Sequence, residues 1–67
     1  MNFTFKPGDA VRLTPGGPIM TVEGVYAEGR IEQVKCQWFS EGRFHEGVFQ
    51  ALTLIRGGQV DRRMADN

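Results

Sequence analysis

The chain has 67 residues, with eight basic and eight acidic side chains that give a formal net charge of zero. This length allows one small domain, because a domain of this size buries only about 60% of the surface that its unfolded chain exposes. The balanced charge disfavours partners that are selected by charge alone, such as an anionic membrane surface.

Cysteine content and hydropathy indicate the cellular compartment. The single cysteine, Cys36, excludes an internal disulfide. The sequence has neither a signal-peptide core nor the ~20 consecutive apolar residues of a membrane-spanning helix. We therefore expect a cytoplasmic protein with no membrane partner.

The N-terminal half predicts two strands. Short runs that alternate apolar and polar residues recur between glycine and proline turns, which is typical of an all-β chain. The first expected strand covers residues 10–13, and the second covers residues 19–26 with Met20 and Val22 inward. Gly24 interrupts the second strand and predicts a bulge or a bend.

The C-terminal half predicts three more strands, at residues 31–39, 43–50 and 52–55. The first of these has the clearest alternation, with four side chains expected to face the interior: Ile31, Val34, Cys36 and Trp38. The segments "AEGR" (27–30) and "SEGR" (40–43) predict hairpin turns, because glycine readily adopts the positive φ that such turns need.

Together these elements predict an all-β fold, a small SH3-like barrel of five bent strands over residues 1–56. Closure of the barrel would remove the free sheet edges that promote aggregation. Residues 57–67 have the composition of a flexible tail, and the spacing of Val60 and Met64 also fits a short docking helix.

Metal, cofactor and catalytic sites are not expected. Cys36 and His45 are too few ligands for a structural zinc site, which needs four. Cys36 falls on the predicted inward face, a Cys–His pair would also require a third group to orient His45, and no candidate for an oxyanion hole stands out. The segment "PGGP" (15–18) lacks the following helix and the lysine of a nucleotide-binding loop, so it is interpreted as a rigid strand connector.

Aromatic residues suggest a binding role, with two alternatives for the partner. Phe39 follows Trp38 directly, so either a bulge turns Phe39 inward or its ring is exposed at the "SEGR" turn. Exposed aromatic rings mark protein-binding patches. Small barrels also bind single-stranded nucleic acid through aromatic rings flanked by basic groups, although glutamates are interleaved with the basic groups here.

Three segments of the chain resemble motifs of the YodC-like family of small uncharacterised bacterial proteins. These are a GD-x-V-x-L strand at residues 8–13, a GGP-x-MTV segment at residues 16–22, and a C-x-WF segment at residues 36–39. The resemblance covers roughly residues 5–55 and implies a stand-alone small barrel without an assigned activity. The GD-x-V opening also looks like the start of KOW-type and other SH3-like barrels, an analogy of fold alone.

The leading hypothesis is a non-enzymatic module that binds a protein, either its own copy or another protein. Its candidate binding residues form an expected rim: Pro15, Gly16, Gly17, Pro18, Tyr26, Phe39 and Arg43. The alternative is single-stranded nucleic-acid binding, whose candidate residues are Arg30, Lys35, Phe39 and Arg43. A third alternative is a homo-oligomer in which the fifth strand or the tail pairs across subunits.

Overall fold

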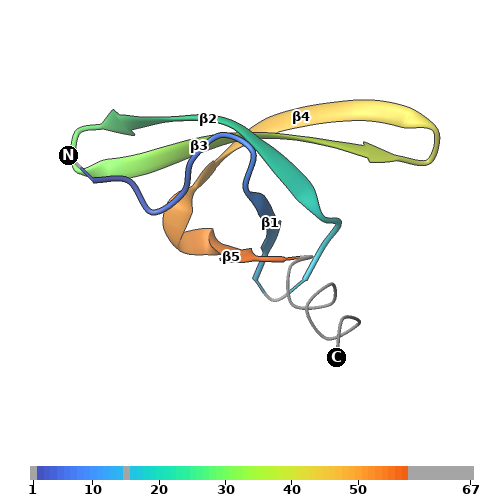
Figure 1. Cartoon of the computed structure of the whole chain (residues 1–67), viewed down its shortest axis with the longest axis horizontal. Helices are drawn as coiled ribbons and strands as arrows, with labels where there is room; N and C mark the ends of the chain where they lie inside the picture. Colours follow the sequence, from blue (N-terminus) through green and yellow to red (C-terminus); the bar gives the residue numbers. More distant parts are fainter. Residues whose placement is uncertain (1, 15, 58–67) are drawn as a thin grey trace.

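The structure is a computed structural model that describes residues 2–14 and 16–57, and its strands form one antiparallel five-stranded sheet (Figure 1). The elements in chain order are β1 (Ala10–Leu13), β2 (Met20–Glu28), β3 (Ile31–Ser40), β4 (Arg43–Gln50), the 3-10 helix η1 (Ala51–Thr53) and β5 (Leu54–Arg56). The predicted all-β class is confirmed. The strands predicted at residues 10–13 and 43–50 have the observed bounds, and the second and third predicted strands differ from β2 and β3 by one or two residues at their ends.

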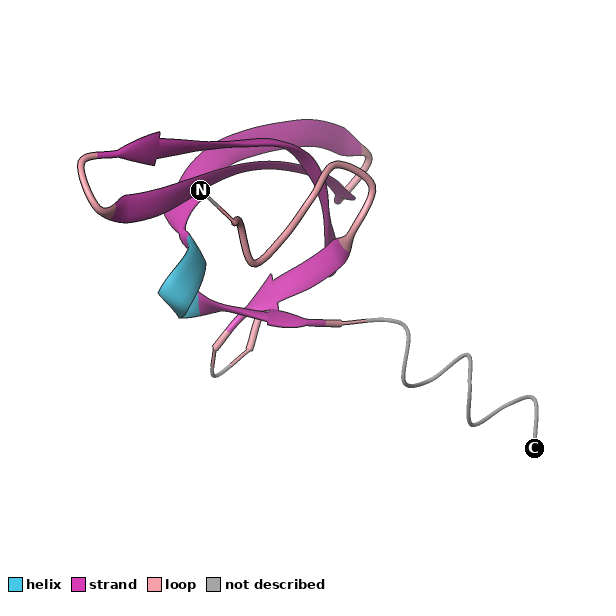
Figure 2. Cartoon of the chain, turned by 60° about the vertical axis from the view of Figure 1, so that its left-hand side comes forward, coloured by secondary structure: helices cyan, strands magenta, loops and turns pink. Residues whose placement is uncertain are grey.

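The strand order across the sheet is β4-β3-β2-β1-β5, so β4 and β5 are its two edges. The sheet curls, and β1 and β5 lie below the meander of β2, β3 and β4 (Figure 2). Among the described residues, no backbone pairing joins β4 to β5, and the sheet is therefore not closed. The N-terminal segment that precedes β1 lies inside the curl (Figure 2).

A β-bulge lies within β2 at the predicted position. Val22 pairs with Cys36 and Gly24 pairs with Lys35, so the register shifts by one residue between Val22 and Gly24. The extra residue bends a strand and increases its local twist. The prediction of a bulge or bend at Gly24 is confirmed.

Both predicted hairpin turns are present. The β3–β4 turn has two central residues, Glu41 with φ 54° and Gly42 with φ 74°, and the flanking Ser40 and Arg43 are paired. Positive φ at both central positions is the signature of a type I′ turn, whose twist matches that of the strands. In the β2–β3 turn, Gly29 has φ 66° and supplies the positive φ directly after β2.

The core is small and lies on the concave side of the curled sheet. Its buried apolar side chains come from the N-terminal segment and from all strands except β4: Phe5, Val11, Met20, Val22, Val34, Cys36 and Leu54. Trp38 and Phe49 are partly buried and pack against this cluster. The inward prediction is confirmed for Val34 and Cys36, which are both 0% exposed.

One sequence-based prediction is wrong, and one predicted strand has different bounds. Ile31 is 43% exposed. Its side chain points to the same face as those of the other odd-numbered residues of β3, whereas the buried side chains of this strand belong to even-numbered residues. The first two residues of the strand predicted at residues 52–55 belong to η1. The observed strand β5 has three residues and extends to Arg56. The tight turn fits the path of the chain from the β4 edge to the β5 edge, and the Thr53 hydroxyl stabilises it by donating to the Gln50 carbonyl at 2.7 Å.

The predicted tail or docking helix at residues 57–67 lies outside the described residues except for Gly57. The Gly57 N–H donates to the Ala10 carbonyl at 3.0 Å, which continues the pairing of β5 with β1 by one residue. Residues 2–14 and 16–57 include no helix with the length and apolar character that crossing a membrane requires.

Candidate functional site

The bulge in β2 decides which side chains reach the outer face, the face of the β2–β3–β4 meander that points away from the core. Val22 is buried and Val25 packs against the core, although the two residues are three positions apart. An uninterrupted strand would turn residues three positions apart to opposite faces. The bulge therefore keeps Val25 inward and leaves Tyr26 on the outer face, where it is 47% exposed.

Two phenylalanines form a cross-strand pair on the outer face, next to the β3–β4 turn. Phe39 of β3 pairs with Phe44 of β4, and their exposed fractions are 71% and 58%. A two-residue turn closes with a hydrogen-bonded pair at Ser40 and Arg43, so the next pair is a non-hydrogen-bonded one, in which side chains lie closest. Of the two alternatives for Phe39, an inward ring at a bulge or an exposed ring, the structure shows the exposed ring.

Val48 extends this apolar surface along β4. It is 48% exposed and lies four positions after Phe44, so both side chains point to the same face of the strand. We call Phe39, Phe44 and Val48 the outer aromatic patch. Exposed apolar residues that occur singly need no explanation, whereas the directly paired Phe39 and Phe44, with Val48 on the same face beyond Glu46, are typical of a binding surface.

A lysine flanked by two glutamates borders the patch. Lys35 pairs with Val48 across β3 and β4, and its Nζ lies 3.8 Å from Glu23 Oε2 and 3.8 Å from Glu46 Oε1. All three side chains are about half exposed, so each ion pair contributes little to stability. Their effect is to neutralise the positive charge beside the patch.

The residues predicted to form one rim are not all brought together. Tyr26 pairs with Gln33, which is six residues from Phe39 along β3, a separation of about 20 Å. The two hairpin turns lie at opposite ends of the long axis of the molecule (Figure 1). Arg43 lies at the same turn as Phe39. Its pairing with Ser40, the residue after Phe39, places the Arg43 side chain on the opposite face of the sheet from the Phe39 ring.

The "PGGP" segment connects β1 to β2. Its described residues, 16–18, are exposed and lie away from the β3–β4 turn in both views (Figures 1 and 2). Pro15 lies outside the described residues. The segment is therefore a connector between strands, as interpreted from the sequence, and it is separate from the outer aromatic patch.

The residues proposed for nucleic-acid binding are also dispersed. Lys35 and Phe39 share the outer face, but Lys35 is held between two glutamates. The Arg43 side chain belongs to the opposite face of the sheet, and Arg30 lies in the β2–β3 turn at the far end of the molecule. These positions do not form a continuous basic track beside an aromatic ring.

Arg30 lines a shallow pocket of about 450 Å³ instead. The pocket lies between the N-terminal segment, the β2–β3 turn and η1, and its walls are mostly apolar. The lining residues are Thr4, Phe5, Arg30, Ile31, Glu32, Ala51, Leu52 and Leu54. Ile31 and Leu52, at 43% and 81% exposure, are therefore the exposed apolar side chains at this pocket.

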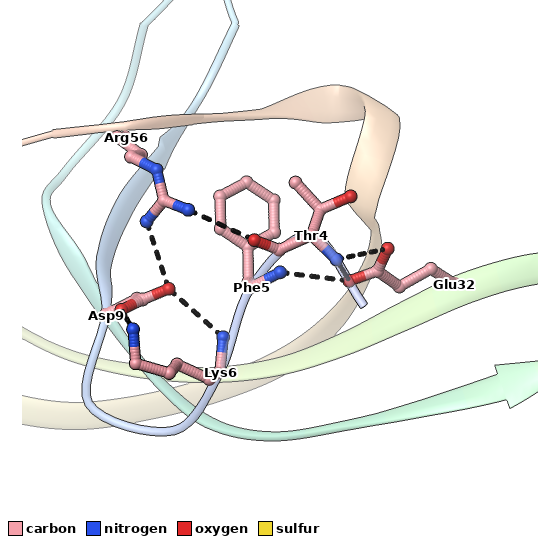
Figure 3. Close-up of polar contacts among 6 residues, drawn as sticks. All are labelled: Thr4, Phe5, Lys6, Asp9, Glu32 and Arg56. Atoms are coloured by element: carbon pink, nitrogen blue, oxygen red, sulfur yellow. Dashed lines mark hydrogen bonds and ion pairs between the residues drawn. The ribbon is translucent and has the colours of Figure 1, made fainter. Parts of the chain in front are cut away.

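A group of polar contacts, which we call the polar clamp, holds the N-terminal segment in place (Figure 3). Arg56 Nη1 donates to Asp9 Oδ2 at 3.0 Å, and Arg56 Nη2 donates to the Thr4 carbonyl at 3.1 Å. The Asp9 carboxylate also accepts the Lys6 N–H at 3.0 Å. The Arg56 guanidinium lies over the Phe5 ring, 5.2 Å from its centroid.

Glu32 completes the clamp from β3. Its carboxylate accepts the N–H groups of Thr4 and Phe5, at 2.9 Å and 3.2 Å for Oε2. Burial raises the pKa of Glu32, but these N–H donors outweigh burial and hold the pKa below its ordinary value. Burial likewise raises the pKa of Asp9, and the Lys6 N–H, Arg56 and the Lys6 ammonium lower it to a net value below the ordinary one. The clamp is thus built for charged carboxylates and serves the fold.

Cys36 and His45 are not directly opposite each other in the β3–β4 ladder. Cys36 pairs with Gly47, and burial raises the pKa of its thiol, which disfavours the thiolate. His45 stacks on Trp38, with ring centroids 5.5 Å apart and an angle of 15° between the rings. Across residues 2–14 and 16–57, no group of three or more His, Cys, Asp or Glu side chains is placed to hold a metal ion.

Sequence reasoning missed part of the patch and all of the clamp. The pairing of Phe39 with Phe44 could have been derived, because a two-residue turn at Glu41 and Gly42 fixes every later pair of the hairpin. The contact between Asp9 and Arg56 joins residues 47 positions apart, and no local pattern indicates it.

Comparison with known proteins gives a family match. The model of a family described as Uncharacterized small protein (DUF2158) matches residues 6–54, a segment that contains β1 to β4 and η1. No curated protein and no solved structure matches the chain.

Proposed function

The chain belongs to the family described as Uncharacterized small protein (DUF2158), and from that premise we propose that it is a non-enzymatic module that binds a protein partner. The binding surface is the outer aromatic patch of Phe39, Phe44 and Val48. The proposal also includes three finer assignments: an SH3-like barrel, YodC-like membership within the family, and a cytoplasmic location.

The exposed Phe39–Phe44 pair is the observation that carries the proposal. These rings lie on the opposite side of the sheet from the core, with 71% and 58% of their surface exposed. Burial of an aromatic or aliphatic side chain of this size stabilises a complex by about 1.5–3 kcal/mol. A type I′ hairpin holds both rings in place, which lowers the entropy lost when a partner binds.

The charge around the patch favours protein over nucleic acid. Lys35 is neutralised by Glu23 and Glu46, and the glutamates would repel a phosphate backbone. Binding of single strands relies on a positively charged groove together with stacking rings. A protein segment with apolar side chains and few charges fits this surface better.

The SH3-like assignment is supported by the order of the elements. A meander of three strands is followed by a 3-10 turn, and β5 then pairs with β1 at the other edge of the curled sheet. The bulge in β2 supplies a bend of the kind that small barrels need at a corner.

Affinity capture from a lysate of the native host tests the proposed function. Three baits are compared: the wild-type chain, the double variant Phe39→Ser/Phe44→Ser, and the control Leu52→Ser. Leu52 is 81% exposed and lines the pocket, so the control removes an exposed apolar side chain elsewhere on the surface.

We expect a protein that the wild-type and Leu52→Ser baits retain and the double variant loses. A protein that all three baits retain equally would contradict the role of the patch. If only the Leu52→Ser bait fails to retain the protein, the binding surface lies at the pocket and not at the patch.

A further inference from the structure

The outer edge of β4 is the longest free edge of the sheet. β4 has eight residues and one neighbouring strand among the described residues, whereas the opposite edge strand, β5, has three residues. β4 contains no proline, and its two charged residues are Arg43 at the turn and Glu46 near the middle. Natural proteins usually protect long edges with prolines, several charges or a covering segment.

The β3–β4 ladder determines which main-chain groups of β4 face away from β3. Ser40 and Arg43 close the two-residue turn as a hydrogen-bonded pair, and hydrogen-bonded and non-hydrogen-bonded pairs then alternate along the ladder. The N–H and C=O groups of Phe44, Glu46 and Val48 therefore point toward the free edge, whereas the Gln50 carbonyl accepts the Thr53 hydroxyl of η1. Their side chains are those of the outer face.

We propose that β4 pairs with β4 of a second copy of this chain, antiparallel about a two-fold axis at Gly47. This inference goes beyond the proposed function, because it uses the edge of the sheet and not its outer face. The two copies present the same outward-pointing groups, so an isologous antiparallel pairing matches donors with acceptors on both sides.

Charge disfavours a neighbouring register. With the axis at Gly47, Glu46 lies opposite Val48 of the second copy, and His45 lies opposite its Phe49. With the axis at Glu46, the two Glu46 carboxylates would lie directly opposite each other, and like charges in that position are destabilising. The Gly47 register also extends the Trp38–His45 stack by an aromatic ring from the second copy.

The area of the edge sets the strength of the dimer. Eight residues of strand span about 26 Å, and with a sheet about 10 Å thick the pairing buries a few hundred Å² per copy. Stable interfaces bury about 800 Å² per partner, so we expect a weak, concentration-dependent dimer. The small core of the chain makes additional burial favourable for the fold.

The variant Val48→Glu separates folding from association. Val48 lies opposite Lys35 within the chain, so the new carboxylate gains a favourable intrachain partner. In the proposed register the same carboxylate lies opposite Glu46 of the second copy and repels it. We expect sedimentation velocity over a concentration series to show a dimer for the wild type and the control Val48→Thr, and at least a tenfold weaker dimer for Val48→Glu. The urea midpoints of the three proteins should agree at a low concentration at which all of them are monomeric.

A second substitution tests the register by rescue. In the double variant Glu46→Lys/Val48→Glu, the axis at Gly47 places the introduced lysine of each copy opposite the introduced carboxylate of the other, and dimerisation should return. With the axis at position 46, two lysines would face each other and the dimer would stay weak, which would overturn the register. A wild-type chain that stays monomeric at its highest soluble concentration, or that forms assemblies larger than a dimer, would overturn the proposal.

Hydrogen exchange tests the same interface without a variant. The amides of Glu46 and Val48 should exchange more slowly as the protein concentration rises, and exchange at these amides that is independent of concentration would contradict the pairing. The outcome is separable from that of the proposed function: a monomer that still captures a protein through Phe39 and Phe44 would reject only the β4 dimer. A dimer that captures nothing would reject only the proposed function.

Discussion

Arg56 Nη1 donates to Asp9 Oδ2 across 3.0 Å and joins the last strand to a turn 47 residues earlier in the chain. Asp9 is 8% exposed, whereas the side chain of Arg56 is 48% exposed. Loss of the contact therefore leaves a nearly buried group without its charged partner, while Arg56 regains water. The Asp9 carboxylate therefore contributes to the stability of the N-terminal segment, together with Glu32 and the buried Phe5 ring.

Asp9→Asn should lower the free energy of unfolding by about 1–3 kcal/mol, the usual effect of weakening a charge-assisted hydrogen bond at a buried group. Urea unfolding followed by Trp38 fluorescence measures the change. The control is Lys6→Ala, because Lys6 is 79% exposed at 3.7 Å from Asp9 and should contribute less than about 0.5 kcal/mol. Equal effects of the two variants would contradict the importance of the Arg56 contact.

Acid should destabilise the fold through Asp9 and Glu32. Both groups have a pKa in the folded protein below their ordinary values of 3.8 and 4.5. As the pH falls, the unfolded chain binds protons at these groups first, so their stabilising contribution is complete above the ordinary values and is lost as the pH falls through the folded values. The free energy of unfolding, measured in urea from about pH 7 down to about pH 3, should decrease over the lower part of that range.

The double variant Asp9→Asn/Glu32→Gln gives the matched control for this pH dependence. It removes both titrating carboxylates, so its free energy of unfolding should decrease less steeply with acid than that of the wild type. Parallel profiles for the two proteins would show that other groups cause the acid sensitivity.

Phe39 should matter little to folding. Phe39→Ala removes an exposed ring and one cross-strand contact, and it should lower the free energy of unfolding by less than about 1 kcal/mol. The matched control is Phe49→Ala, because Phe49 packs against the core and lies 6.1 Å from Trp38 between ring centroids. That variant should lose about 2 kcal/mol or more. A larger loss for Phe39→Ala than for Phe49→Ala would show that Phe39 is structural.

Glu41 should be replaceable with a gain in stability. It has φ 54°, a conformation that is unfavourable for residues other than glycine and asparagine. Glu41→Asn should raise the free energy of unfolding by about 0.5–1 kcal/mol, since asparagine tolerates the left-handed region. In the same turn, Gly42→Ala places a Cβ at φ 74° and should be destabilising. A thermal melt of both variants checks the opposite signs.

The strands could be predicted from the sequence because their period is local. Alternation located β1 to β4, and Gly24, Gly29 and Gly42 marked the bulge and the two turns. The 3-10 helix η1 was not predicted, because "ALTLI" has the short apolar composition of a strand, and the need to cross between sheet edges is a property of the whole topology.

The candidate site was predicted only in part. The position of Phe39 after Trp38 left two alternatives open, and the regular β3–β4 register decides for the exposed ring. Tyr26 and Phe39 do not lie together as expected, because register and not composition decides which outer residues are neighbours. The polar clamp depends on Arg56, Asp9 and Glu32, whose separation in the chain leaves no local signal.

Amide chemical-shift mapping tests the central claim, a protein-binding outer face, most directly. The captured partner and a single-stranded oligonucleotide are titrated separately into the labelled wild-type chain at low salt. We expect the partner to shift the amides of Phe39, Phe44 and Val48 and to leave those of Ile31 and Leu52 at the pocket unchanged. Shifts of the patch with the oligonucleotide but not with the protein would contradict the account.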